Sequence, residues 1–554
     1  MRKLATGLVV AAATIAAAAC KDVLGVSNPN NPNIAQVFAT ATDIEAVFAQ
    51  GFLQVGFTAS GIHTNNIAPQ LNAMSFENYG NVANFDMVYR AAIPRKFIDN
   101  SVNNSGATAH FADFQNMQKL ARTLSNAIAA LDAFTGAGHT LGSAAQNARA
   151  RAWGFFELGL ALGNTALVYD SAAVVYPTTP TVGPPQPLVG HVDVMKAALG
   201  DLDTALAIAN SSDVTSNATA FTAPWINGLS VDRATFVKIV HSYKARFRAG
   251  DARTPADRQA VDWNAIIADA TAGITSDLVV QLSIQAGWQQ REVTNAYRYQ
   301  GWGDASMMYL GMADTSRAYD AWLATSMINR QPFLLKTPDA RWPAGETRDA
   351  QNTVSGGANG VPGSTGLYFR NRPAGEDPPG DPWGTSFYDH FRFRYLTINN
   401  SDNAGPWIEF SKAENDLLAA EGYIRKGDIA SAAPLIDNTR VAKGKLPPLT
   451  GAVTTAADPV PGGSACVPRV PAGPSGPTAC GNIMEALKYE YRVETYFTGY
   501  GTWFFAERGW GDLVEGTPLE FPVPYQEMQV RLLPFYNLGG VGGPSAAAKG
   551  TYGY

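Results

Sequence analysis

Residues 413–428 read AENDLLAAEGYIRKGD, and this stretch decides the fold class of the 554-residue chain. Its apolar residues recur at the spacing of one helix face. The pattern stops at Gly427-Asp428, where glycine can end one helix and aspartate can cap the next. A second helical pattern follows at once. The sequence therefore predicts two helices, over 409–426 and 429–442, joined by a tight turn.

Much of the chain before this pair has the same helical texture. Apolar residues recur at three- and four-residue spacing over 113–134, which predicts one long amphipathic helix, and a second is predicted over 144–162. Small residues such as Gly159 on one face of the second helix allow a neighbouring helix to approach closely. Strand signals are few, for example over 277–283, so the predicted fold class is mainly α. Shorter helices are predicted over 193–209, 232–248, 263–273 and 316–327.

Three loop-rich regions interrupt the helices, at about 275–310, 343–400 and 451–481. Residues 343–384 contain 15 Gly or Pro in 42 positions, which is too many for continuous helices. Aromatic residues are frequent here, whereas disordered linkers are poor in them. We therefore expect the second region to be ordered and packed through its aromatic side chains, which are Tyr368, Phe369, Trp383, Phe387, Tyr388, Phe391, Phe393 and Tyr395.

Several distinct motifs are spread along the chain. Around the helix pair they are LLAAEGY at 417–423, GD at 427–428, IDNTR at 436–440 and GKLP at 444–447. Others are VLGVSNPN at 23–30, AWGFFEL at 152–158 with GN at 163–164, EYRVETYFTG at 490–499, WF at 503–504, RG at 508–509 and FPVPYQE at 521–527. Together they resemble the SusD/RagB family of outer-membrane lipoproteins. Thr502 and Phe505 depart from the family, which often has Arg and Asp at these places in a buried ion network.

The resemblance implies one large α-helical SusD-like domain of residues 20–554, with helix pairs of the tetratricopeptide type and long irregular loops. Length alone favours about three domains of about 150 residues each. We expect the single domain, because the motifs span nearly the whole chain in family order.

The first twenty residues resemble a bacterial secretory signal. Arg2 and Lys3 precede an uncharged, Ala-rich stretch over 4–19, and Cys20 follows directly. A cysteine at the new N-terminus would accept a lipid, so we predict a signal peptide at 1–19 and a lipid anchor on Cys20. An uncleaved membrane helix is the first alternative, but a span needs about 20 apolar residues. Cleavage by an ordinary signal peptidase, suited by Ala17-x-Ala19, is the second.

Charge and cysteine content fit an exported protein. Loss of Arg2 and Lys3 with residues 1–19 leaves 39 of the 41 basic residues against 47 acidic ones, a net charge of −8. Nucleic-acid binding needs clustered Lys and Arg, whereas the Lys and Arg of this chain are scattered. No nucleic-acid partner is therefore expected. Cys466 and Cys480 lie in one Pro/Gly-rich loop and predict a disulfide. The alternative of a metal or redox pair lacks a nearby His and the C-x-x-C spacing.

The sequence does not indicate an enzyme. It has no nucleophile-elbow, zinc-protease, phosphate-loop or EF-hand motif, so no catalytic residue, metal or cofactor is predicted. The charges of Lys488, Glu490, Arg492 and Glu494 predict the solvated or ion-paired face of an amphipathic helix. The alternative is that Glu490 and Glu494 form an acid/base pair, which would require a cleft between them.

The family resemblance implies binding in place of chemistry. SusD-like proteins capture an oligosaccharide or another nutrient at the outer membrane and pass it to a TonB-dependent, SusC-like transporter. The expected protein is therefore lipid-anchored and exposed at the cell surface. Two alternatives stay open, an exported helical-barrel carbohydrate-active enzyme and a tetratricopeptide-type scaffold that binds proteins.

A sugar site needs aromatic faces for C–H surfaces and amide or carboxylate groups for hydroxyls. Two aromatic- and amide-rich stretches fit, over 288–302 and 63–81. The alternatives are that the Trp side chains pack beneath their own loop and that the Asn side chains cap turns. The predicted ligand-binding residues are Trp288, Tyr297, Tyr299, Trp302, Asn65, Tyr79 and Asn81.

Overall fold

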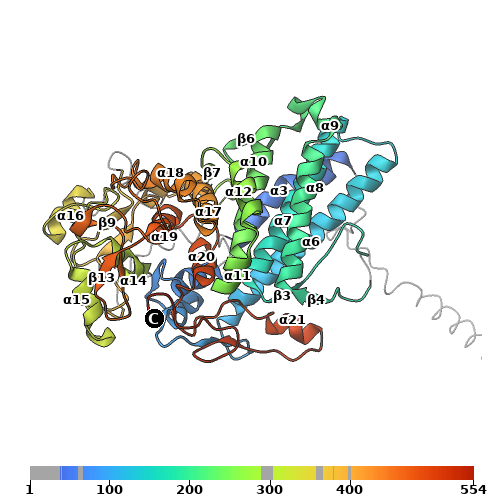
Figure 1. Ribbon diagram of the computed structural model, residues 1–554. Helices are drawn as coiled ribbons and strands as arrows, with labels where there is room; N and C mark the ends of the chain where they lie inside the picture. Colours follow the sequence, from blue (N-terminus) through green and yellow to red (C-terminus); the bar gives the residue numbers. More distant parts are fainter. Residues whose placement is uncertain are drawn as a thin grey trace, which may run out of the picture.

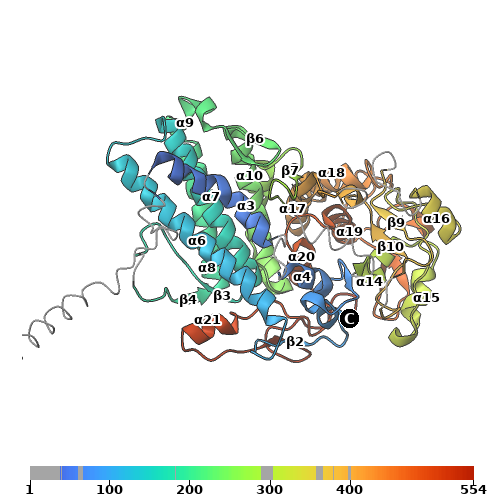
Figure 2. The same cartoon turned by 180° about the vertical axis from the view of Figure 1, so that it is seen from behind.

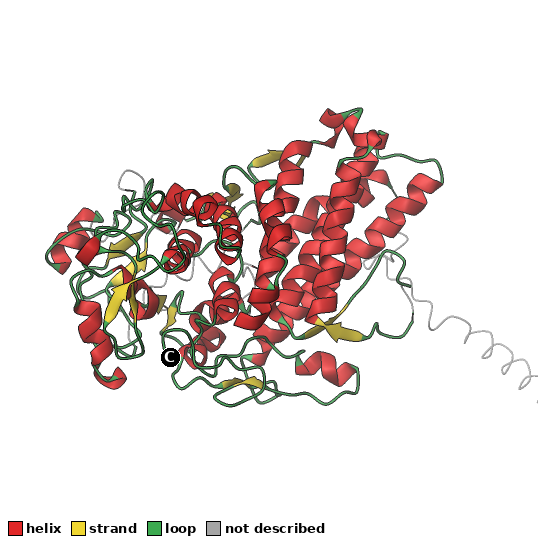
Figure 3. Ribbon diagram, in the orientation of Figure 1, coloured by secondary structure: helices red, strands yellow, loops and turns green. Residues whose placement is uncertain are grey.

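Long helices form one side of the molecule, and shorter helices with loop-rich segments form the other (Figures 1 and 3). The computed structural model describes residues 38, 40–59, 66–180, 183–288, 303–356, 366–377, 380–396 and 401–554. Its mainly α character confirms the predicted fold class. The long helices are α3 (Ala41–Ala59), α6 (Ala107–Gly136), α7 (Ala144–Val168), α8 (His191–Ala209) and α10 (Arg233–Gly250).

Helix α7 lies at the centre of this bundle and contacts α3, α6, α8 and α10. Glycines permit the close contacts that the sequence predicted. A Cβ atom on Gly159 would lie 2.9 Å from Leu202 Cδ2 of α8, and one on Gly163 would lie 2.2 Å from Phe247 Cε2 of α10. Any larger residue at Gly163 would therefore push α10 away, because cores are close-packed.

The predicted helix pair is confirmed as α17 (Lys412–Arg425) and α18 (Ile429–Arg440), which contact one another. The Asp428 side chain accepts a hydrogen bond from the backbone N–H of Ser431, as the capping prediction required. The predicted start at residue 409 is wrong by three residues. The Ser411 side chain caps α17 by accepting a hydrogen bond from Glu414 N–H, and the preceding residues pair as strand β11 (Gly405–Phe410).

The other predicted helices form with shifted ends. The helix predicted over 316–327 is shorter, because Arg317 has a left-handed backbone (φ 76°) and helix geometry begins only after it. The remaining helices, of which several were not predicted, are α4 (Ala68–Met74), α5 (Met87–Ala91), α9 (Ser212–Thr215), α11 (Pro255–Ala260), α12 (Trp263–Thr271), α14 (Met307–Leu310), α15 (Ala318–Ala324), α16 (Arg348–Val354), α19 (Ile483–Thr495), α20 (Thr502–Trp510) and α21 (Tyr525–Val530).

Seven two-stranded antiparallel pairs occur within the described residues. The strand predicted over 277–283 is confirmed as β7 (Leu278–Leu282), which pairs with β11 so that Val280 lies opposite Trp407. The other pairs are β1 (Tyr79–Gly80) with β8 (Gly303–Asp304), β2 (Phe97–Ile98) with β14 (Leu538–Gly539), β3 (Ser171–Ala173) with β4 (Leu188–Gly190), β5 (Ala223–Ile226) with β6 (Leu229–Val231), β9 (Phe369–Asn371) with β10 (Tyr388–His390), and β12 (Arg469–Pro471) with β13 (Thr478–Cys480).

The aromatic-rich loop region is packed, as predicted, wherever its residues are described. Phe369 stacks on Trp342 with 3.8 Å between ring centroids, and Tyr388 meets the same indole edge-on. Phe369, Tyr388 and Phe391 are fully buried. The Gly- and Pro-rich backbone is therefore held by side-chain packing in place of long ladders of hydrogen bonds.

Cys466 and Cys480 form the predicted disulfide, with 5.7 Å between their Cα atoms. No helix within the described ranges combines the length and the apolar character needed to cross a membrane.

Candidate ligand-binding groove

A groove of about 810 Å³ opens beside the β2–β14 pair. Helix α5 and the loop after β2 form its walls, and Figure 2 shows β2 at the lower end of the molecule. The side chains that give the groove its chemistry are Asp86, Tyr89, Lys96, Phe97, Asp99, Asn103, Asn104, Asn537 and Val541.

Two aromatic rings face this groove with much of their surface exposed. Tyr89 is 48% exposed and Phe97 is 49% exposed, whereas most aromatic residues of the chain are buried. The Lys96 Nζ lies 5.0 Å from the centroid of the Tyr89 ring, a cation–π distance. Exposed aromatic faces beside a few polar groups are the usual make-up of a small-molecule site.

The polar groups of the groove are held in position by backbone contacts. Asn104 Nδ2 donates to the carbonyl of Asp99 at 2.7 Å, and its Oδ1 accepts from Gly106 N–H at 2.9 Å. Asn537 Oδ1 accepts from Asn100 N–H at 2.9 Å, which joins the segment before β14 to the loop after β2. Amide groups fixed in this way can recognise hydroxyl groups without losing much side-chain entropy.

Two buried arginines hold the segment that presents Phe97. Arg90 donates to the carbonyls of Lys96 at 3.3 Å and Phe97 at 3.0 Å, and Arg95 donates to the carbonyl of Met74 at 2.8 Å. Burial lowers the pKa of both guanidinium groups, to about 9 for Arg95. Both stay charged at neutral pH, so the carbonyls that they bind are strongly fixed.

The predicted site residue Tyr79 is 4% exposed and lies in the hydrophobic core. Its ring meets Trp383 edge-on at 5.2 Å, and its hydroxyl donates to Asp381 Oδ2 at 3.2 Å. Burial, together with the charge of Asp381, raises the pKa of the phenol. Tyr79 therefore supports the loop that carries Asp381 and turns no face to the solvent.

The other predicted site residues are only partly described. Trp288 is half-buried and packs against the main hydrophobic core. Its backbone carbonyl accepts a hydrogen bond from Ser283 N–H at 2.7 Å. The side-chain amide atoms of Asn81 are buried and have no hydrogen-bond partner in the described part of the chain. Asn65, Tyr297, Tyr299 and Trp302 lie outside the described residues.

The structure brings the ends of the two predicted stretches together. Strand β1 pairs with β8, so that Tyr79 lies opposite Asp304 and Gly80 lies opposite Gly303. Helix α5, which carries Tyr89, contacts β1. The predicted residue Tyr79 thus lies on a strand that contacts the helix carrying Tyr89, but it does not line the groove.

Sequence reasoning missed the groove residues themselves. The signal was present in residues 97–104, FIDNSVNN, which combine an aromatic residue with three asparagines. The contribution of Asn537 had no local signal, because it is 437 residues away from its partner Asn100.

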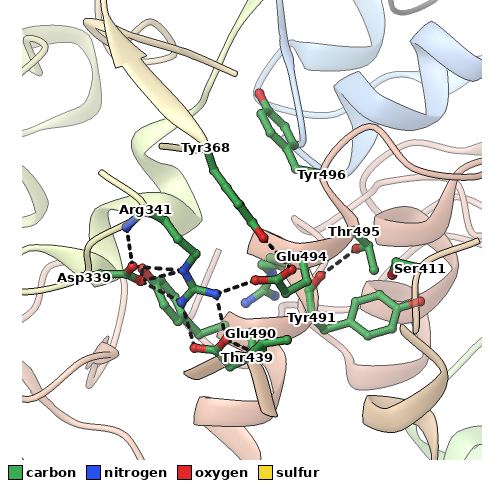
Figure 4. Close-up of polar contacts among 12 residues, drawn as sticks. Asp339, Arg341, Tyr368, Ser411, Thr439, Glu490, Tyr491, Glu494, Thr495 and Tyr496 are labelled. Atoms are coloured by element: carbon green, nitrogen blue, oxygen red, sulfur yellow. Dashed lines mark hydrogen bonds and ion pairs between the residues drawn. The ribbon is translucent and has the colours of Figure 1, made fainter. Parts of the chain in front are cut away.

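The carboxylates of Glu490 and Glu494 are part of a buried ion network and do not face a cleft (Figure 4). Arg341 Nη1 lies 2.7 Å from Glu490 Oε2 and 2.9 Å from Glu494 Oε1, and Arg341 Nη2 lies 2.7 Å from Asp339 Oδ2. Burial raises the pKa of Glu490, and Arg341 opposes that rise. The charged face of α19 is therefore ion-paired, as predicted, and the alternative of an acid/base pair across a cleft is wrong.

A second network joins α19 to α20. Arg492 lies 2.8 Å from Glu507 Oε1 and 2.6 Å from Asp512 Oδ2, and Lys488 lies 2.9 Å from Asp512 Oδ1. The region around Thr502 and Phe505 thus contains a buried ion network formed by other residues. In the described residues no three His, Cys, Asp or Glu side chains are grouped so that they could hold a metal ion.

Comparison with known proteins gives structural neighbours only. The sequence matches no family model and no curated protein. The fold is similar to that of a SusD-like protein from Bacteroides fragilis, with 12% identity, a TM-score of 0.49 and coverage of 86% of this chain and 88% of that one. These neighbours are SusD-type proteins.

Two others carry the same family name. A SusD superfamily protein from Bacteroides vulgatus has 13% identity, a TM-score of 0.46 and coverage of 86% of this chain and 89% of that one. A SusD/RagB family protein from Bacteroides thetaiotaomicron has 11% identity, a TM-score of 0.44 and coverage of 89% of each chain. This is the family that the sequence motifs resemble.

Proposed function

We propose that this protein is a SusD/RagB-type surface lipoprotein that binds an oligosaccharide in the groove of Tyr89 and Phe97. It then delivers the sugar to a TonB-dependent, SusC-like transporter of the outer membrane. The observation that carries the proposal is the pair of exposed aromatic rings, 48% and 49% exposed, beside fixed amide groups.

Sugar rings have two kinds of surface, and the groove offers a match for each. The C–H faces of a pyranose are apolar and can stack on Tyr89 and Phe97. The hydroxyl groups need donors and acceptors, which Asp99, Asn103 and Asn537 supply. An open groove suits a chain of sugar units that is captured and released again.

Binding to a library of oligosaccharides, followed by titration calorimetry, tests the proposal. Replacing Tyr89 or Phe97 by Ala removes one stacking surface worth about 0.5–1.5 kcal/mol, so we expect affinity to fall about two- to thirteenfold for each variant. Phe535→Ala is the matched control, because Phe535 is 51% exposed but lies outside the groove. Equal losses in all three variants, or no sugar bound by the parent protein, would refute the proposal.

The enzyme alternative has one specific observation behind it. Asp86 and Asp99 both line the groove, and burial raises the pKa of Asp86, as a general acid requires. Product analysis after long incubation with each bound oligosaccharide separates the two functions. We expect unchanged oligosaccharides; shortened products that disappear in Asp86→Asn would establish the enzyme.

Copurification tests the delivery step. A lipid-anchored delivery protein should copurify with a membrane barrel, whereas a tetratricopeptide-type scaffold should copurify with other proteins and bind no sugar.

Trp288 and Asn81 remain predicted ligand contacts. Their Ala variants belong in the same oligosaccharide titrations as those of Tyr89 and Phe97.

A further inference from the structure

A second groove, of about 710 Å³, lies between α7, α8 and the segment that joins β3 to β4. Its walls are largely apolar, and they are formed by Phe155 of α7, by Val174, Tyr176 and Pro187 of the joining segment, and by Val189 of β4. It shares no lining residue with the groove of Tyr89 and Phe97.

One buried carboxyl group lines this apolar groove. Asp201 of α8 is only 5% exposed, and its Oδ2 has no hydrogen-bond partner among the residues that the structure describes. Leaving a buried polar group unpaired costs free energy, so native proteins rarely do so without a reason. Burial alone raises the pKa of Asp201 to about 8.

We propose that this groove binds an organic cation, a guanidinium or ammonium group attached to an apolar body. The cation would pair with Asp201, and the apolar body would lie against Phe155 and Tyr176. Such an ion would satisfy the unpaired carboxyl, because a buried charge is tolerated when an opposite charge and hydrogen bonds compensate it.

The charges and rings around Asp201 fit a cation better than an anion. Among the described residues, two carboxyl groups, of Asp193 and Asp201, and one cation, Lys196, line the groove; Asp193 and Lys196 are both exposed, so Asp201 is the only buried charge-bearing group of the three. Tyr176 is 49% exposed, so its ring is free to pack against the apolar body of the ligand.

The wall opposite α8 is anchored to α6. Ser125 Oγ donates to the carbonyl of Tyr176, and Arg122 Nη1 donates to the carbonyl of Thr179 at 3.3 Å. The groove is therefore preformed on this side, which lowers the entropy that a ligand must overcome on binding.

Titration calorimetry of the full chain with benzylguanidinium tests the inference, and benzylurea is the neutral molecule of matched shape. We expect benzylguanidinium to bind at least tenfold more tightly than benzylurea. Asp201→Asn keeps the size of the side chain but cannot form a carboxylate opposite the cation, so it should abolish this tenfold preference. Equal affinity for the two probes, or a preference that survives in Asp201→Asn, would overturn the proposal.

Two controls separate the site from general effects. Asp203→Asn removes a carboxylate from the same helix, but Asp203 lies outside the groove and pairs with Lys244 at 2.8 Å. The Asp203→Asn variant should retain the tenfold preference. Loss of the preference in this variant too would show that the carboxylates attract cations in general, and it would refute the assignment of the site to Asp201. Tyr89→Ala should also retain the preference, which makes the result independent of the sugar groove. Thermal melts check that each variant is folded.

Discussion

The carboxylate of Glu421, part of the LLAAEGY motif on α17, binds the buried guanidinium of Arg258. Two hydrogen bonds join them, at 3.0 Å from Nε and 2.6 Å from Nη2, and Arg425 adds a further contact at 2.8 Å. Arg258 and Glu421 are each 1% exposed. Burial alone would raise the pKa of Glu421, but the two arginines outweigh it and lower that pKa to about 2.

Replacing Glu421 by Gln should therefore lower the free energy of unfolding by about 3 kcal/mol at pH 7, because the Arg258 charge stays buried without its partner. Denaturant titration measures this loss. Since the folded-state pKa is depressed, the stabilisation is fully present above the ordinary value of 4.5 and is lost as pH falls through about 2. The variant should lack that part of the pH dependence.

Glu527→Gln is the control for this prediction. Glu527 of α21 pairs with Arg531, just past the end of that helix, at the i,i+4 spacing of the Glu421–Arg425 contact, but its side chain is 26% exposed. Surface pairs contribute little, so we expect a change below about 0.5 kcal/mol. Similar losses in the two variants would contradict the role given to burial.

At the scale of elements, the segment at the end of α21 is unusual for its exposed apolar side chains. Val530 is 76% exposed, Leu532 is 92% exposed, and Leu533 and Phe535 are 46% and 51% exposed. Figure 2 shows α21 and β2 at the same end of the molecule. Contiguous exposed apolar side chains are typical of protein interfaces, which suits the delivery step of the proposed function.

Leu532→Glu should reduce copurification of the proposed transporter severalfold, because a charge in an apolar contact must be desolvated. Oligosaccharide affinity and unfolding free energy should stay within error, since the side chain touches neither the groove nor the core. Ile328→Glu is the matched control, as Ile328 is 84% exposed and belongs to the short 3-10 helix Met327–Asn329. Unchanged copurification with Leu532→Glu would remove this segment from the interface.

The elements that the sequence predicted are those whose pattern is local. Helices α6, α7, α8 and α10 each have an apolar face repeated over four or more turns, and α3 carries the same pattern at Ile44, Phe48, Phe52 and Val55, although it was not predicted. The short strands have no such pattern. β1 and β2 are two residues long and form only because β8 and β14, far away in the sequence, lie beside them.

Dependence on contacts between residues far apart in the sequence also limits prediction of the two grooves. An Asn-rich stretch next to Phe97 can be recognised in the sequence, but its exposure depends on β14 and on the buried arginines of the 90–97 segment. Asp201 occupies one turn of a regular amphipathic helix, and nothing in that local pattern distinguishes it from a solvated residue. The joining segment beyond β3 creates its apolar surroundings.

At the scale of the whole molecule, the main hydrophobic core collects residues from Ile44 of α3 to Tyr552 near the C-terminus. It includes Trp153 of α7, Trp407 of β11 and Phe504 of α20, so the bundle and the loop-rich side share it. Cys20, the proposed lipid acceptor, lies outside the described residues. Because the main core begins at Ile44, we expect folding and ligand binding not to depend on the proposed anchor.

Cys20→Ala tests this separation. The variant should no longer incorporate labelled palmitate and should leave the membrane fraction, because the lipid on this residue is the proposed anchor. Growth on the bound oligosaccharide should slow, whereas the affinity of the purified variant for that sugar should stay within twofold of the parent protein. If neither the parent protein nor the variant incorporates palmitate, ordinary signal-peptide cleavage is favoured. Loss of sugar binding in the variant would show that the anchor and the groove are not independent.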